Sequence, residues 1–248
     1  MQVSIDPRGR VRPRTGFIVI VVCASLLSLW IRTGVPAYII AGARYDDQLF
    51  IRLARFILIG QWLGPFDNTT LVKGVGYPIF AALAFAMGVP LKMAETVLYI
   101  ATSIAGASLV VRLSRSHLIG AVLFLALVLN PVLWGNELAR VIREGIYVSL
   151  TLLSVLSAVV LIVAEARSRV ALLGASACTG SIWAWFWLTR EEGIWLLPSL
   201  AVILLIGVIK VRDADRTSYL ATTKSLVKPF GIALGVAGVL VGLVAAKN

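Results

Sequence analysis

The sequence is poor in charged residues. Of its 248 residues, 14% are charged and 59% are hydrophobic. Soluble domains typically have about 25% charged and about 45–50% apolar residues. This composition excludes an ordinary soluble domain and predicts an all-α protein that crosses a membrane several times.

Histidine and cysteine are almost absent. The chain has one histidine, His117, and two cysteines, Cys23 and Cys178, each inside an apolar run. This pattern lacks the spacing of a zinc site and does not predict a disulfide. We expect both cysteines to be small buried residues and His117 to lie in a loop.

Negative charge is scarcer than positive charge. The chain has 23 Lys and Arg against 12 Asp and Glu, a net charge of +11. In a membrane protein such an excess marks the loops that stay in the cytoplasm, so no nucleic-acid partner is predicted. The arginine-rich segment 1–15 is therefore expected to be a cytoplasmic N-terminus. The apolar run 16–31 has no small-residue cleavage signal, which favours a retained first helix over a signal peptide.

Further apolar runs predict about seven to eight transmembrane segments. The longer runs after the first are 93–111, 117–133, 145–164, 170–188, 194–209 and 230–246. The run 77–89 is too short to cross, because a crossing helix needs about 20 residues. We expect it to dip in and return or to form a broken half-helix, so that 77–111 makes one net crossing. The alternative is two full crossings.

The polar connections alternate in character. Three are basic, at 112–115, 167–169 and 210–228, and the connections 136–144 and 189–193 contain glutamates. The positive-inside rule places the basic connections in the cytoplasm and the acidic ones outside, on the same side as a long first loop, 32–77. Residues 16–248 are thus predicted to form a single transmembrane module with a cytoplasmic loop at 210–228. Two full crossings within 77–111 would put the first loop on the opposite side.

The first outer loop contains a polar stretch, 43–78, that opens with Asp46 and Asp47 and closes with a KGVGYP turn. Arg52 and Arg55 are three residues apart, which on a helix puts both on one side. Because charges inside a span are costly, we expect this helix to lie along the membrane surface.

Carboxylates are the candidate catalytic groups: Asp46, Asp47, Glu144, Glu191 and Glu192. A carboxylate near a low-dielectric boundary gains proton affinity and a nearby arginine opposes that gain, which suits a general base. The alternative is that they are ordinary solvated loop charges. Two adjacent carboxylates repel each other, and a cation or a substrate would relieve that repulsion.

Basic residues are the candidate anion contacts. Arg44 and Arg190 offer guanidinium groups that bond phosphate oxygens in pairs, and Lys73 lies beside exposed glycine backbone. A lysine that reaches to the membrane interface is the alternative for Lys73.

Four segments together resemble a known superfamily. They are YDDQLFIRLARFILIGQWLGPFDNTTLVKGVGYPIF (45–80), NP (130–131), IREGIY (142–147) and LTREEGIWLLP (188–198). The arrangement is similar to the GT-C superfamily of integral-membrane glycosyltransferases, which includes protein O-mannosyltransferases and the aminoarabinose transferase of lipid A.

The resemblance implies roles for these residues. Asp46 or Asp47 would be the catalytic acidic residue of the first outer loop, and Glu144 the second acidic position. Arg190 would open an Arg-x-x-Gly element. The predicted substrate contacts are Arg44, Lys73, Tyr77, Arg190, Glu191 and Glu192, and no metal ligands are predicted, although some members of the superfamily use a divalent cation.

The activity implied by the resemblance is inverting transfer of a sugar from a polyprenyl-phosphate-linked donor to an acceptor at the outer face of a bacterial cytoplasmic membrane. Family members usually have further helices and often an outer domain, so a partner chain or a further region is expected to supply the acceptor side. The alternatives are a lipid-carrier transporter or flippase, and a non-catalytic assembly subunit.

Overall fold

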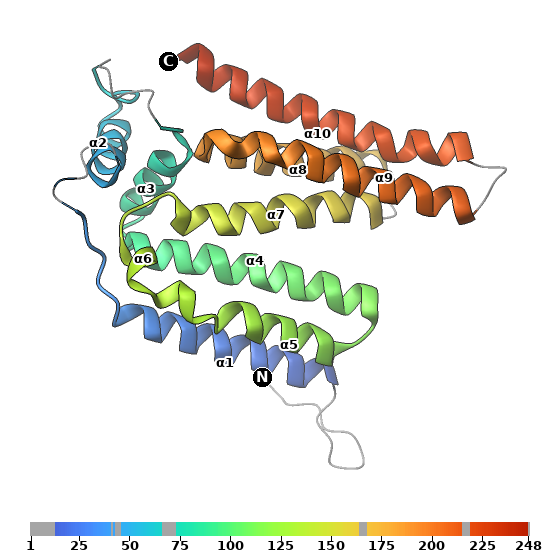
Figure 1. Ribbon diagram of the computed structural model, residues 1–248, viewed down its shortest axis with the longest axis horizontal. Helices are drawn as coiled ribbons and strands as arrows, with labels where there is room; N and C mark the ends of the chain where they lie inside the picture. Colours follow the sequence, from blue (N-terminus) through green and yellow to red (C-terminus); the bar gives the residue numbers. More distant parts are fainter. Residues whose placement is uncertain are drawn as a thin grey trace. The chain divides into compact units, whose positions relative to one another are not determined.

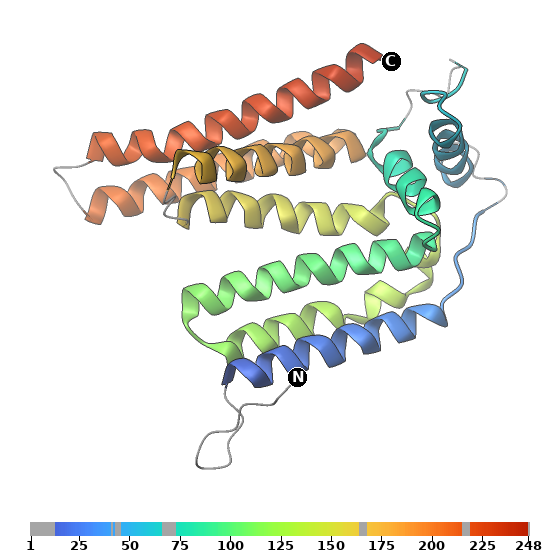
Figure 2. The same ribbon diagram turned by 180° about the vertical axis from the view of Figure 1, so that it is seen from behind.

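The computed structural model describes residues 13–40, 42, 46–65, 73–163, 168–214 and 219–247. These residues form helices and connections and include no strand, which confirms the all-helical class (Figures 1 and 2). One isolated parallel bridge pairs Tyr38 with Arg140.

Ten α-helices and two short 3-10 helices follow one another in the described residues. They are α1 (Pro13–Thr33), α2 (Asp47–Leu58), α3 (Gly76–Ala86), α4 (Leu91–Ser114), α5 (His117–Val128), η1 (Pro131–Trp134), α6 (Asn136–Ala139), α7 (Glu144–Val163), α8 (Arg169–Thr189), η2 (Glu191–Trp195), α9 (Leu196–Ala214) and α10 (Tyr219–Lys247).

Six helical segments in the described residues are long and apolar enough to cross a membrane. They are Arg14–Thr33, Leu91–Ser114, His117–Trp134, Glu144–Val163, Arg169–Thr189 and Val227–Lys247. Two shorter apolar helices are Gly76–Ala86 and Gly193–Ile206. Membrane-protein character is therefore confirmed, while a total of seven to eight crossings stays a prediction.

The segment 77–111 contains one long helix and one short one. With 11 residues, α3 extends only about 16 Å, less than the roughly 30 Å of a bilayer core, whereas α4 has 24 residues. Gly88 has a left-handed φ of 66° and ends α3, and Pro90 precedes α4. Only α4 in this segment is long enough to cross, and the single net crossing stays a prediction.

The cytoplasmic loop predicted at 210–228 is mostly helical. Residues up to Ala214 belong to α9, and α10 begins at Tyr219. The sequence reasoning ended the helices where the apolar runs end, but a helix continues past its apolar part when its charged side chains reach water. Helices α9 and α10 therefore extend into 210–228 from either side, and its assignment as a cytoplasmic connection stays a prediction.

The chain divides into two compact units. Unit 1 comprises Met1–Phe66 and Pro78–Ser149, and unit 2 comprises Asp67–Tyr77 and Leu150–Asn248. The single transmembrane module inferred from the sequence stays a prediction.

In unit 1, α1, α4 and α5 lie side by side (Figures 1 and 2). Their shared core contains Ala24, Ile100, Ala107, Phe124 and Val128. Helices α2 and α3 lie at the end of this bundle where α1 ends and α4 begins. The bundle thus places the connection that contains Asp46 and Asp47 at one end.

In unit 2, α10 packs along α8. A Cβ atom at Gly180 of α8 would overlap the carbonyl oxygen of Ala233 and the side chain of Val236, so a glycine is needed for this close approach. The Trp183 Nε1–H donates to the carbonyl oxygen of Ser154 over 3.2 Å and ties α8 to α7.

Helix α2 has one buried and one exposed side. Leu49, Phe50 and Leu53 are buried, whereas Arg52 and Arg55 are exposed. The prediction that both arginines share one side is confirmed. The position of α2 on the membrane surface stays a prediction.

The rare residues differ in part from expectation. Cys23 and Cys178 are free cysteines, as expected, but both are exposed, so the prediction that they are buried is wrong. An apolar run in a membrane helix has a side that faces lipid as well as a side that faces the core. His117 is the first residue of α5, where its ring lies edge-on to Phe17 with centroids 6.0 Å apart.

Candidate functional site

A buried ion pair holds the start of α2. Both oxygens of Asp47 lie 2.8 Å from Nε of Arg140, and Oδ1 lies 2.7 Å from Nη2. The backbone N–H of Ile40 donates to Oδ2 over 2.9 Å. Asp47 is 0% exposed, so its charge is satisfied entirely within the protein.

This environment keeps Asp47 ionised. Burial on its own would raise the pKa of the carboxyl group, but the hydrogen bonds from Arg140 and Ile40 and the charge of Arg140 outweigh burial and lower the pKa. The hydrogen bond to Asp47 raises the pKa of Arg140 in turn. An enclosed carboxylate of lowered pKa is a poor proton acceptor and a good anchor.

Asp46 differs from its neighbour. Its side chain is 42% exposed, and its Oδ2 lies 3.8 Å from Nη2 of Arg140. Arg140 is therefore the cation beside both carboxylates and relieves the repulsion that the sequence implies. Part of the Asp46 side chain is therefore exposed, whereas the Asp47 side chain is not.

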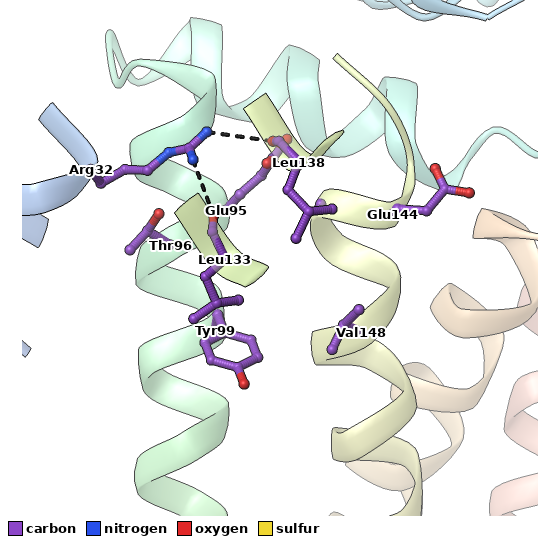
Figure 3. A pocket seen from close by; sticks show the side chains of 9 residues that line it. Arg32, Glu95, Thr96, Tyr99, Leu133, Leu138, Glu144 and Val148 are labelled. Atoms are coloured by element: carbon purple, nitrogen blue, oxygen red, sulfur yellow. Dashed lines mark hydrogen bonds between the residues drawn. The ribbon is translucent and has the colours of Figure 1, made fainter. Parts of the chain in front are cut away.

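Arg140 belongs to the connection between α5 and α7, which unit 1 holds at several points. The Tyr38 N–H donates to Ala139 and the Val141 N–H donates to Tyr38, over 3.3 and 3.2 Å. Arg32, at the end of α1, donates to the carbonyl oxygens of Leu133 and Leu138 over 3.2 and 3.5 Å (Figure 3).

Glu144 begins α7 and lines a small cavity. The cavity has a volume of about 30 Å³, and its other polar lining groups include Arg32, Glu95 and Tyr99. A water needs roughly 10–15 Å³ of such volume, so there is room for water but not for a sugar. In Figure 3 the Glu144 carboxylate is turned away from the other labelled side chains.

The turn at Lys73–Tyr77 packs on the end of α8 within unit 2. A Cβ at Gly74 would overlap the Leu188 carbonyl, and one at Gly76 would overlap Thr189. The Trp185 Nε1–H donates to the carbonyl oxygen of Gly76 over 3.1 Å. The two glycines let the backbone pass this close.

This packing brings two of the predicted anion contacts onto adjoining backbone. Lys73 precedes Gly74, and Arg190 follows Thr189 directly after α8. Both cations are half-buried. Tyr77, in contrast, is fully buried, and its role as a substrate contact stays a prediction.

An apolar groove of about 270 Å³ lies between α8, α9 and α10 of unit 2. Its lining residues include Trp183, Trp187, Leu196, Leu200 and Leu234. The Cα atom of Trp187 lies 3.0 Å from where a Cβ of Gly193 would be, so the groove begins beside the turn that follows Arg190.

The predicted site residues fall into both units. Asp46, Asp47 and Glu144 belong to unit 1, whereas Lys73 and Arg190 belong to unit 2. The remaining predicted contacts are Tyr77, which belongs to unit 2, Arg44, which lies outside the described residues, and Glu191 and Glu192, whose side chains are not described.

Sequence reasoning missed the partners of these groups. Arg140 lies in a connection noticed only for its glutamates, and Arg32 was treated as the end of an apolar run. Lys92 and Glu95 are two opposite charges three residues apart in a membrane helix, and this local spacing predicts a pair. No local pattern links Arg140 with Asp47, because 93 residues separate them.

The described residues contain no group of three or more His, Cys, Asp or Glu side chains that could hold a metal ion. The fold and these sites define an all-helical integral membrane protein with a carboxylate–arginine cluster at one end of unit 1. No family model, curated protein or solved structure matches the chain.

Proposed function

We propose that this protein is a glycosyltransferase that takes a sugar from a polyprenyl-phosphate-linked donor at the outer face of a bacterial cytoplasmic membrane. The observation that carries the proposal is the unequal pair of adjacent carboxylates. Asp47 is enclosed and bound by Arg140, while Asp46 is 42% exposed beside the same guanidinium. One carboxylate fixes the connection, and the other faces the reactants.

Asp46 is the general base in this proposal. Its carboxylate takes the proton of an acceptor hydroxyl group as that oxygen attacks the anomeric carbon. The bond between the anomeric carbon and the phosphate oxygen breaks, and its electron pair leaves with the phosphate. Attack opposite the leaving group inverts the anomeric configuration. Glu144 contacts the sugar of the donor.

Lys73 and Arg190, both in unit 2, are predicted anion contacts and suit a lipid phosphate. A phosphate leaving group needs its developing charge stabilised, and both cations lie on the adjoining backbone at the end of α8. The apolar groove that begins beside the turn after Arg190 suits part of a lipid chain. A cationic head region next to an apolar groove matches the two parts of a lipid phosphate.

Separate Asp46→Asn and Asp47→Asn variants test the proposal. We expect Asp46→Asn to fold normally and to lose about 10²–10⁴-fold in transfer rate, the usual contribution of a general base. Asp47→Asn should instead lower the melting temperature, because it weakens a buried ion pair. Asp213→Asn, at the far end of α9, is the control. Unchanged transfer in the Asp46 variant would refute this base.

A lipid-carrier flippase is the second candidate, and buried charge in the helices favours it. Arg32, Lys92 and Glu95 are each at most 5% exposed. Ionisable groups inside transmembrane segments commonly mark transport paths. Movement of a fluorescent polyprenyl phosphate across vesicles by the purified protein, without sugar transfer, would favour this function over the enzyme.

A further inference from the structure

The N-terminal part of α4 contains a buried ion pair that the proposed reaction does not use. The Lys92 Nζ lies 3.0 and 2.8 Å from the two carboxylate oxygens of Glu95, and both residues are 5% exposed. A buried pair is weak evidence for stability, because apolar residues of similar volume often serve as well. Its presence points to a role outside α4.

The Glu95 carboxylate packs against the start of α7. A Cβ atom at Gly145 would overlap both oxygens and the carboxyl carbon of Glu95, so a larger residue there would displace the Glu95 carboxylate. Gly145 directly follows Glu144. The positive end of the α7 dipole favours a carboxylate in this place.

The same connection is held at two earlier points. Arg32 of α1 bonds the carbonyl groups of Leu133 and Leu138, and Asp47 of α2 bonds Arg140. Buried charged side chains from α1, α2 and α4 therefore contact the connection in succession. Of these three contacts, the one that Glu95 makes is at Gly145, the residue directly after Glu144.

We propose that Glu95, held by Lys92, is a positioning residue that fixes the start of α7 and so directs the Glu144 side chain. Figure 3 shows Glu95 on α4 and Glu144 at the start of α7, with the Glu144 carboxylate turned away from Glu95. The catalytic importance of this contact rests on the proposed function, in which Glu144 contacts the donor sugar.

A cysteine probe at position 144 tests the positioning without an activity assay. Glu144→Cys is placed in a Cys23→Ser, Cys178→Ser protein, and maleimide labelling is timed with and without Gly145→Ala. We expect the rate to change about threefold or more, because thiol reactivity follows exposure and nearby charge. Two controls are Gly174→Ala, where a Cβ meets nothing within 4 Å, and a probe at exposed Ser114→Cys. Neither control rate should change.

A second variant keeps the test decisive if Gly145→Ala fails to fold. Replacing Lys92 and Glu95 together by Met removes the pair and keeps an apolar packing that the buried site tolerates. The labelling rate at 144 should again change while the rate at 114 does not. An unchanged rate at 144, or an equal change at both positions, would overturn the positioning role.

Sugar transfer distinguishes this inference from the proposed function. In protein that retains Glu144, Glu95→Gln should raise the KM for a polyprenyl-phosphate-linked hexose. Glu95→Asp, which keeps a carboxylate, should raise the KM less. A labelling change at 144 in a protein without transfer would leave the positioning in place and refute the proposed function. Normal transfer with an unchanged labelling rate at 144 would support the proposed function and overturn the positioning role.

Discussion

Units 1 and 2 hold their connections in different ways. In unit 1, buried charged side chains such as Arg32 and Asp47 bind the connection between α5 and α7. In unit 2, Gly74 and Gly76 let the backbone contact the end of α8 directly. The charges of Arg32 and Asp47 in unit 1 are thus committed to structure, whereas Lys73 and Arg190 of unit 2 stay half-buried, with Arg190 beside an apolar groove.

Removal of Arg140 should break the arrangement in unit 1 most strongly. Arg140→Met leaves the Asp47 carboxylate buried without its cation, which costs about 3–5 kcal/mol of folding free energy. Denaturation of the purified protein in detergent, followed by circular dichroism, measures this cost. Arg55→Met, at an exposed position of α2, is the matched control. Equal losses in the two variants would contradict the assignment of Asp47 as an anchor.

A methyl group at Gly74 should disturb unit 2 somewhat less. Gly74→Ala places a Cβ against the Leu188 carbonyl, and overpacking of this kind costs about 1–3 kcal/mol. Gly174→Ala in α8 adds the same atom in open space and should not destabilise the protein. Equal melting temperatures for the two alanine variants would show that the turn does not depend on this close approach.

Loss of a cation in unit 2 should weaken donor binding with little effect on folding. Arg190→Gln removes a charged contact worth about 1.5–3 kcal/mol, so the KM for the donor should rise about tenfold or more. Lys73→Gln should have a smaller effect, because an ammonium group makes no paired contact. Titration of the donor in a transfer assay checks both variants. Unchanged KM together with unchanged kcat in both variants would contradict contact with the donor phosphate.

Acid should affect unit 1 only at low pH. The folded pKa of Asp47 is below its ordinary value, so the stability that it contributes is complete above the unfolded pKa of about 3.9 and is lost as pH falls through the folded pKa. The contribution of Asp47 to the melting temperature should therefore stay level from about pH 7 to 5 and fall near pH 3. Asp47→Asn should show a smaller fall over that lower range. An equal fall in both proteins would contradict the contribution of this pair.

Local patterns predicted much of the helical architecture. The brevity of the run at 77–89 predicted that it could not cross, and α3 is indeed only 11 residues long. The spacing of Arg52 and Arg55 predicted their shared side. Both features depend on residues that are close in the sequence.

The partners at the candidate site could not be predicted in the same way. Asp47 and Arg140 meet across 93 residues, and the sequence offers no local rule for such a pair. Adjacent Asp46 and Asp47 also look equivalent in the sequence, although the fold buries one and exposes the other. Tertiary packing, and not spacing, separates their roles.

Sugar transfer by the purified wild-type protein tests the central claim most directly. The protein in nanodiscs is given polyprenyl-phosphate donors that carry isotope-labelled pentoses and hexoses, together with membrane lipid acceptors, and the product is analysed by NMR. The account predicts a labelled product of inverted anomeric configuration whose formation is lost in Asp46→Asn. Transfer that persists in Asp46→Asn, or no labelled product from the wild-type protein, would contradict it.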